Sequence, residues 1–245
     1  MDEGHSHKQA PMANLRRQER SAIEVVAKRF LGKWEYVSDA QGVCLITAGK
    51  RVALSLAMLK ARGAGHTSLK PGLRFDKVAN RVLERLQDAV GETAPDGVTV
   101  LLTITAPIRL ASKTVAALED KLQALLGRVT KTANLKAVVH GNRVHIRLLR
   151  SASQSSSIMI GFVHNADSDP FLLLNMASEM LDFACARATK PATRLAGERW
   201  LVVISPRTSS CLEAYRYIYS QLRMTMEFKK VLIVFGDGGV GTLTA

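Results

Sequence analysis

Three apolar segments in the last third of the chain, each followed by a short polar loop, constrain the fold more than any other feature. Residues 158–163, 200–204 and 231–235 have the length and composition of buried strands. Amphipathic segments lie between them, so the order is strand, helix, strand, helix, strand. Right-handed crossovers make such strands parallel and bring their carboxyl ends to one edge of a sheet. We therefore expect a parallel βαβαβ segment whose edge can bind a ligand.

The preceding residues alternate between helical and strand patterns, which predicts an α/β protein with a mixed β-sheet and helices on both faces. A serine-rich stretch at residues 151–157 is a candidate linker. We predict a flexible tail at residues 1–14, a β-rich α/β part at 15–150 and the βαβαβ segment at 158–245, which could also form one continuous domain. The expected elements are helices at 15–31, 76–90 and 112–126, strands at 34–37, 43–47, 51–56 and 98–105, and a hairpin over 135–149.

The chain is strongly basic, with a formal net charge of +13 and a pI near 10.0. Basic domains attract polyanions, and the release of counterions favours binding. Nucleic acid is the commonest partner of this kind. An acidic protein, or a basic surface with no partner, would account for the same charge.

The cysteine content and the hydropathy of the sequence bear on the cellular compartment of the protein. The three cysteines have no metal-binding or redox spacing, which is typical of a reducing cytoplasm. No apolar run approaches 18 residues, so we expect no transmembrane helix and no membrane partner. The sequence therefore indicates a cytoplasmic protein.

The expected hairpin carries the densest group of basic side chains. A two-residue turn at Gly141-Asn142 would place Lys136 opposite Arg147. Because side chains alternate across a strand, one face is apolar and the other is basic. Such a ribbon suits phosphate contacts, although an ordinary solvated strand face explains the same pattern. The nucleic-acid-binding candidates on this face are Lys136, His140, Arg143, His145 and Arg147.

Acidic and histidine side chains follow two of the three apolar segments. His164, Asp167 and Asp169 come after the first segment, and Asp237 comes after the last. Asp167 and Asp169 are candidate ligands of Mg²⁺ or Mn²⁺, and His164, Asp167 and Asp237 are candidate catalytic groups. The alternative is local: Asp169 caps a helix that begins at Pro170, and Asp167 is a turn residue.

Two further loops have weak anion-binding patterns. Residues 236–241 are rich in glycine but lack the Lys-Ser/Thr of a P-loop. Residues 205–210 offer hydroxyls and one arginine that could hold an anion. A strand-to-helix turn explains most of the second loop.

The first helix and the strands after it resemble the restriction-endonuclease-like nuclease superfamily over residues 15–58. The helix carries Glu24, Asp39 lies between strands, and the third strand holds Ser55 and Ala57 where that superfamily has a metal-binding acid and a lysine. Only Glu24 and Asp39 can be carried over. The resemblance therefore implies a nuclease-like fold without cleavage, because one carboxylate does not readily hold the metal that polarises a phosphodiester.

The residues support three function hypotheses from different classes. The leading one is a basic nucleic-acid-associated binding protein without catalysis of its own. The second is a metal-dependent phosphodiester or nucleotide enzyme, with Mg²⁺ at the strand edge. The third is an assembly subunit that binds an acidic protein.

Overall fold

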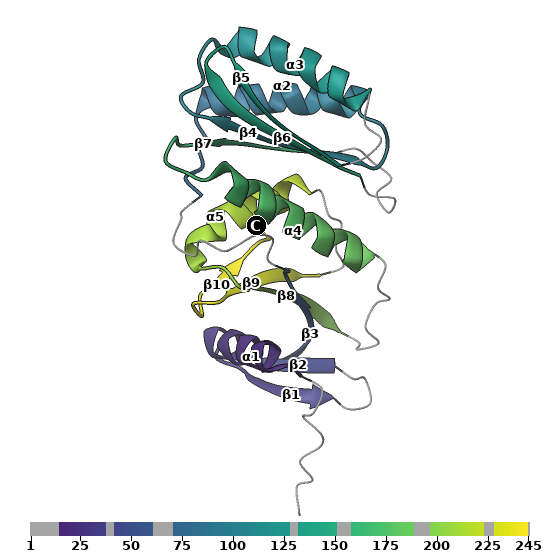
Figure 1. The fold of residues 1–245 in the computed structure, drawn as a ribbon. Coiled ribbons are helices and arrows are strands. Elements are labelled where there is room, and N and C mark those ends of the chain that lie inside the picture. Colours follow the sequence, from purple (N-terminus) through teal and green to yellow (C-terminus); the bar gives the residue numbers. More distant parts are fainter. Residues whose placement is uncertain are drawn as a thin grey trace, which may run out of the picture. The chain divides into compact units, whose positions relative to one another are not determined.

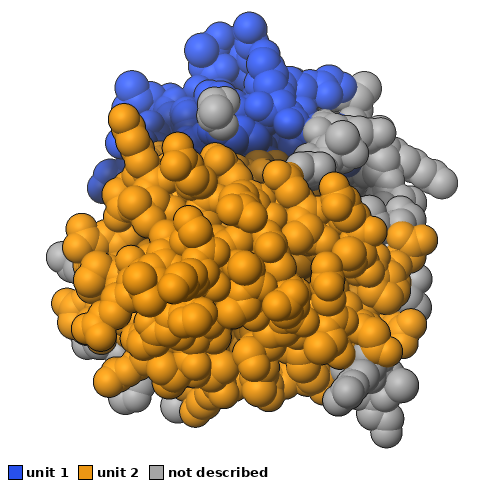
Figure 2. Space-filling view, turned by 90° about the horizontal axis from the view of Figure 1, so that it is seen from above, with its two compact units in different colours: residues 1–59, 191–209, 226–245 blue, residues 60–190, 210–225 orange. Residues whose placement is uncertain are grey.

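The chain forms two compact units in the computed structural model (Figures 1 and 2). Unit 1 consists of Met1–Leu59, Pro191–Ser209 and Met226–Ala245, and unit 2 consists of Lys60–Lys190 and Ser210–Thr225. Unit 2 is therefore inserted into unit 1 along the sequence. The structure describes residues 15–37, 42–60, 71–127, 132–150, 158–188, 197–222 and 228–244.

Unit 1 is a six-stranded mixed sheet with the order β1-β2-β3-β8-β9-β10. Its three central strands, β3, β8 and β9, are parallel, and the outer pairs are antiparallel. The helix α1 covers one face, where Ile23 and Val26 pack against Leu54, Val202 and Leu232. The elements are α1 Arg17–Arg29, β1 Lys33–Val37, β2 Gly42–Thr47, β3 Lys50–Met58, β8 Glu198–Ser205, β9 Lys230–Phe235 and β10 Val240–Thr242.

Unit 2 is built on a four-stranded sheet with the order β5-β6-β4-β7. Two helices, α2 and α3, lie on one face, and α4 and α5 lie on the other (Figure 1). The strand β4 is buried on both faces, which explains why its sequence is mostly apolar instead of alternating, and its threonines Thr99 and Thr103 are buried as well. The elements are α2 Lys77–Thr93, β4 Val98–Thr105, α3 Ala111–Leu126, β5 Ala133–Val139, β6 Asn142–Arg150, β7 Ile158–His164, α4 Pro170–Ala188 and α5 Leu212–Gln221.

The expected α/β class is confirmed, and the predicted elements are present with ends shifted by a few residues. The prediction that the last three apolar segments pair with one another is wrong in one respect. β8 and β9 are parallel neighbours, but β7 pairs with β4 in the other sheet. The candidate linker at 151–157 falls between β6 and β7 inside unit 2, and, like the tail at 1–14, it lies outside the described residues. Within the described ranges, no helix combines the length and apolarity needed to span a bilayer.

The register of the hairpin also differs from the prediction. The turn is formed by His140 and Gly141, both with positive φ, and Val139 pairs with Asn142. A type I′ turn needs positive φ at both central residues, and glycine adopts it freely at the second one. Lys136 therefore lies opposite His145, not opposite Arg147. The shift preserves which side chains share each face.

Candidate functional site

The carboxyl ends of the parallel strands β4 and β7 define one end of the unit 2 sheet. Ala106 donates its backbone N–H to the carbonyl of His164, and Asn165 donates to Gly72. Three helices begin close to these strand ends, because α3 follows β4, α4 follows β7, and the residues just before α2 bridge to β7. The topology thus brings chain segments that are distant in sequence to the same place.

Exposed basic side chains gather at this end. Lys77, Arg81 and Arg85 line a cavity of about 270 Å³ between α2 and α3, together with Ala111 and Ser112 at the start of α3. At Gly141, a Cβ atom would lie 3.4 Å from the side chain of Arg109, so the hairpin turn adjoins the same region. The exposed basic residues here are Arg74, Lys77, Arg81, Arg85, Arg109, Lys113, Lys136, His140 and Arg143.

The same end carries the exposed large apolar side chains of unit 2. Among the described residues of the unit they are Phe75, Val78, Leu110, Val138 and Phe171, with exposures of 50%, 49%, 60%, 73% and 38%. Each lies at a helix start or beside the hairpin turn. Exposed apolar side chains that cluster, instead of being scattered, indicate an interaction site. We call these residues, with the nine basic residues above, the strand-end surface.

The basic hairpin face is divided by α4. Lys136 Nζ lies 4.7 Å from the ring centroid of Phe171, and the His145 ring lies 5.0 Å from the same ring. Arg147 donates to the side chains of Asn134, Asn175 and Ser178. The exposed residues Lys136, His140 and Arg143 therefore belong to the strand-end surface, whereas Arg147 is held by protein groups.

Burial lowers the pKa of His145 and of His164. For His145 the nearby charges of Lys136 and His164 lower it further, while the carboxylates of Asp167 and Asp169 partly oppose the effect at His164. The His164 Nδ1 lies 2.7 Å from the carbonyl oxygen of Asn165, and its Nε2 lies 3.4 Å from Thr105 Oγ1. His164 is 2% exposed, so its ring packs within the strand end.

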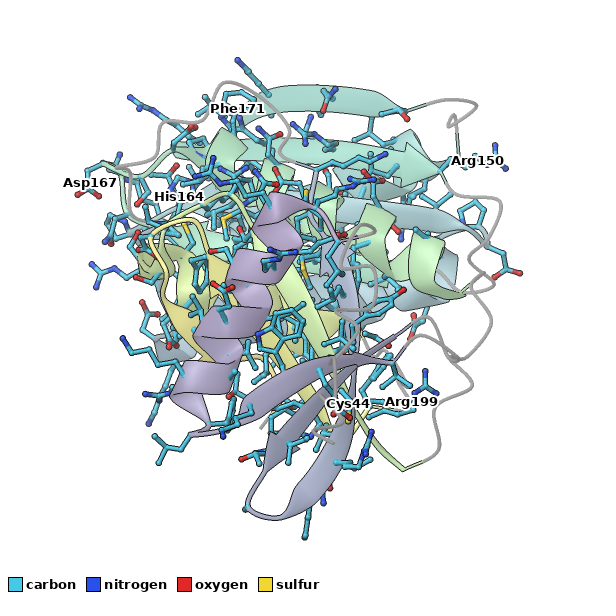
Figure 3. All side chains as sticks on the ribbon, turned by 90° about the horizontal axis from the view of Figure 1, so that it is seen from below. Cys44, Arg150, His164, Asp167, Phe171 and Arg199 are labelled. Atoms are coloured by element: carbon cyan, nitrogen blue, oxygen red, sulfur yellow. The ribbon has the colours of Figure 1, made fainter. Side chains whose placement is uncertain are left out.

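One of the two candidate metal ligands, Asp169, has a local structural role. Asp169 accepts the backbone N–H of Phe171 at the start of α4, as expected for a helix cap. Figure 3 shows His164, Asp167 and Phe171 on one side of unit 2, and Arg150 on the other side. Asp237 belongs to unit 1. Across the described ranges, no three His, Cys, Asp or Glu side chains are grouped so that they could hold a metal ion.

The loops that follow β8 and β9 meet at the edge of the unit 1 sheet. Asp237 accepts hydrogen bonds from the backbone N–H and the hydroxyl of Ser209, and from the N–H of Gly239. These bonds lower the pKa of Asp237. Gly236 donates to the carbonyl of Arg207. The glycine-rich loop is thus held in place by hydrogen bonds within unit 1, and the Asp237 carboxylate is the main acceptor.

A cavity of about 460 Å³ opens at this edge, between the strand ends and the first half of α1. Its lining is mostly apolar. The sequence contained no direct signal for it, because the residues of α1 that line it are separated from the strand loops by most of the chain. The lining residues are Arg17, Gln18, Ser21, Ala22, Val25, Met58, Leu59, Ile204, Ser205, Pro206, Val234, Phe235, Gly236 and Gly238.

The residues behind the nuclease resemblance do not form a shared centre among the described residues. Glu24 is exposed on α1, Ser55 is buried in β3, and Asp39 lies outside the described residues. Comparison of the whole chain with protein-family models, with curated proteins and with solved structures finds no match. The functional argument therefore depends on the geometry of the two strand ends.

Proposed function

We propose that this protein binds nucleic acid through the strand-end surface of unit 2 and has no catalysis of its own. The observation that carries the proposal is the gathering of exposed cations and exposed apolar side chains at one end of one sheet. Phosphates are attracted by Lys and Arg, and base faces pack on apolar and aromatic groups. Groups suited to both ligand chemistries thus lie at the same end of the unit 2 sheet.

Unpaired strands fit this surface better than duplex. Phe75 is 50% exposed and Phe171 is 38% exposed. Lys136 Nζ lies over the ring of Phe171, and Arg74 precedes Phe75 in the sequence. In a duplex the base faces are stacked against each other, so they cannot pack on side chains. In a single strand they are free to do so, and each stacked base contributes about 1–3 kcal/mol.

The direct test is fluorescence anisotropy with a mixed-sequence single strand, in DNA and RNA forms, and with duplex DNA, as a function of salt. Replacing Arg74, Lys77 and Arg81 with Gln removes three cations of the surface. We expect affinity at 0.1 M salt to fall by about tenfold or more, and the salt slope to decrease by about 2, because roughly 0.7 counterions are released per contact with a single strand.

A matched variant tests whether position matters or only charge. Lys28, Arg29 and Lys33 are exposed in unit 1, and replacing them with Gln changes the net charge equally. We expect this variant to bind nearly as the unmodified protein does. Equal losses in the two triple variants, or capture of an acidic protein without any nucleic-acid binding, would contradict the proposal.

A second pair of variants separates the two halves of the hairpin face. Arg143→Gln removes an exposed cation and should weaken binding several-fold. Arg147→Gln breaks the contacts with Asn175 and Ser178, so it should lower thermal stability while leaving the affinity of the folded protein almost unchanged. Anisotropy and thermal melting of the same samples distinguish these outcomes. Weaker binding by Arg147→Gln with unchanged binding by Arg143→Gln would indicate that nucleic acid binds at the covered part of the hairpin instead.

Phe171→Leu tests the preference for unpaired strands. Leucine keeps much of the apolar volume but removes the ring. We expect single-strand affinity to fall by about fivefold or more and duplex affinity to stay the same. An equal effect on both forms of DNA would show that base stacking on Phe171 does not contribute.

A further inference from the structure

The cavity at the edge of the unit 1 sheet has no part in nucleic-acid binding as proposed above. Its floor is formed by Met58, Ile204 and Val234, which are direct neighbours across the parallel strands β3, β8 and β9. Above them lie Ala22 and Val25 of α1. The volume of about 460 Å³ falls within the range of small-molecule sites, and the carboxyl edge of parallel strands is a common place for them.

Short side chains on α1 leave this space open. Ser21 and Ala22 face the strand ends, whereas the larger Ile23 and Val26 are fully buried against the sheet. Side chains longer than alanine at position 22 would occupy the space above the floor. The cavity is therefore a consequence of the α1 sequence and of the position of the helix on the sheet.

The far wall of the cavity is set by backbone contact. A Cβ atom on Gly236 would lie 2.9 Å from the carbonyl oxygen of Pro206, so only glycine fits there without a shift of the loops. Gly236 also donates to the Arg207 carbonyl at 2.8 Å. The wall is thus formed before any ligand binds, which reduces the entropy lost on binding.

The electrostatic character of the lining is simple. Arg17 is the only charged side chain among the lining residues, and Gln18 and Ser21 add polar groups beside it. Three carboxylates adjoin lining residues in sequence: Asp237 is engaged by Ser209 and Gly239, Glu19 accepts the backbone N–H of Arg16, and Glu24 is exposed. The lining therefore offers an apolar floor together with one positive charge.

We infer that unit 1 binds a small organic anion with an apolar body. The apolar part packs on Met58, Ile204 and Val234, and the anionic group, a carboxylate or a phosphate ester, pairs with Arg17. The neutral analogue of such a ligand loses the charge-assisted hydrogen bond but keeps the packing.

Three probes that share one ring system test this inference with the full chain: 2-naphthoate, 2-naphthyl phosphate and the neutral 2-naphthamide. Calorimetric titration should show at least one anion binding about fivefold or more tightly than the amide. The tighter of the two anions identifies the preferred anionic group. Equal affinity of all three probes, or no binding with Kd below about 5 mM, would overturn the inference.

Variants place the binding in the cavity. Ser21→Trp introduces an indole at the mouth, at an exposed position that tolerates the substitution, and should reduce anion binding by about tenfold or more. Arg17→Gln should lower anion affinity to that of the amide while leaving amide binding unchanged. Lys28→Gln, on the same helix but outside the cavity, is the matched control and should have no effect.

Two results would show that the anions bind elsewhere. One is anion affinity unchanged by Ser21→Trp. The other is a loss of affinity in the Arg74, Lys77 and Arg81 variant that equals the loss in Arg17→Gln. Because that triple variant alters only unit 2, failure of this inference and failure of the nucleic-acid proposal are separate outcomes.

Discussion

In each unit a set of parallel strands is followed by polar loops, but the surfaces at these two strand ends have opposite chemistry. In unit 1 the loops after β8 and β9 bond to each other and enclose a mostly apolar cavity with one charged residue. In unit 2 the corresponding end exposes many cations among apolar side chains. The carboxyl edge of parallel strands is thus a location for a site, and the segments that follow the strands decide which kind of site it becomes.

Chain connectivity explains the difference. In unit 2, α3 and α4 begin directly after β4 and β7, so their first residues lie at the strand ends and remain accessible. In unit 1, the chain passes into unit 2 after β3 and again after β8. Among the described residues, no α-helix of unit 1 begins there, because the short 3-10 helix Ser209–Cys211 leads into α5 of unit 2. The cover comes from α1, which precedes all the strands.

The largest effect on stability is expected from substitution of Asn142, whose side chain holds the chain segments at the strand end of unit 2 together. Its side chain accepts the N–H of Arg109, and its amide group lies within 3.0 Å of the Arg109 and Val139 carbonyls and of Thr114 Oγ1. Asn142→Ala removes these hydrogen bonds, whereas the bond from Thr114 Oγ1 to the Arg109 carbonyl remains. We expect the free energy of unfolding to fall by about 3 kcal/mol, measured by urea denaturation.

Asn80→Ala is the matched control for that substitution. Asn80 is exposed and makes one 3.3 Å bond to the carbonyl of Phe75. Loss of this bond should lower the free energy of unfolding by less than about 0.5 kcal/mol. Hydrogen exchange should show the Asn142 effect in β5, β6 and α3; an equal effect of the two substitutions would mean that the network does not organise the unit 2 end.

A smaller loss is expected at the enclosed end, from Gly236→Ala. The added methyl group would meet the Pro206 carbonyl, so the loops after β8 and β9 must move apart. We expect a loss of about 2 kcal/mol in the free energy of unfolding. Gly91→Ala, at a helical position with no atom within 4 Å of the new Cβ, should instead stabilise the protein by about 0.5–1 kcal/mol. Destabilisation of similar size by both would argue against a close backbone contact at Gly236.

The smallest expected effect is a pH dependence confined to unit 2. Burial holds the pKa of His145 and His164 below the ordinary histidine value of about 6.5, so the unfolded chain binds protons more readily than the folded chain. Stability is therefore complete above pH 6.5 and declines as the pH falls through and below that value. The described residues of unit 1 contain no histidine.

Hydrogen exchange between pH 7.5 and 5.5, corrected for intrinsic rates, measures both units in one sample. Protection should decrease in β6 and β7 and stay constant in β8 and β9. His164→Asn and His145→Gln should each flatten the dependence. A uniform decrease in both units would assign the effect to other groups.

Local structure was predictable from the sequence because local chemistry determines it. Asp76 accepts the N–H groups of Val78 and Ala79, as a cap with a helical pattern behind it should. The partner of β7 was not predictable. Its residues are apolar on both faces like those of β8 and β9, so the pattern indicates burial but not the neighbouring strand. A tertiary fit is visible at Gly161, where a Cβ atom would lie 2.5 Å from Leu83 of α2.

The candidate site was predictable only in part, for the same reason. The cations of the hairpin stand out in sequence, and Lys136 and Arg143 lie on the strand-end surface. Those of α2, such as Lys77 and Arg81, have the spacing of any solvated helix face. Only the topology brings them next to the start of α3, and only α4, which packs over Arg147, removes that residue from the exposed set.

The nested arrangement of the units has a consequence for synthesis. The four strands of the unit 2 sheet all lie within residues 60–190, whereas β3 of unit 1 pairs with β8, which follows that stretch. On the ribosome, the unit 2 sheet therefore has all its strands before the central pair of unit 1 can form. A protease that cuts between residues 60 and 190 leaves β3 and β8 on different fragments, which then remain joined by non-covalent contacts alone, among them the β3–β8 ladder and the packing of α1 on the sheet.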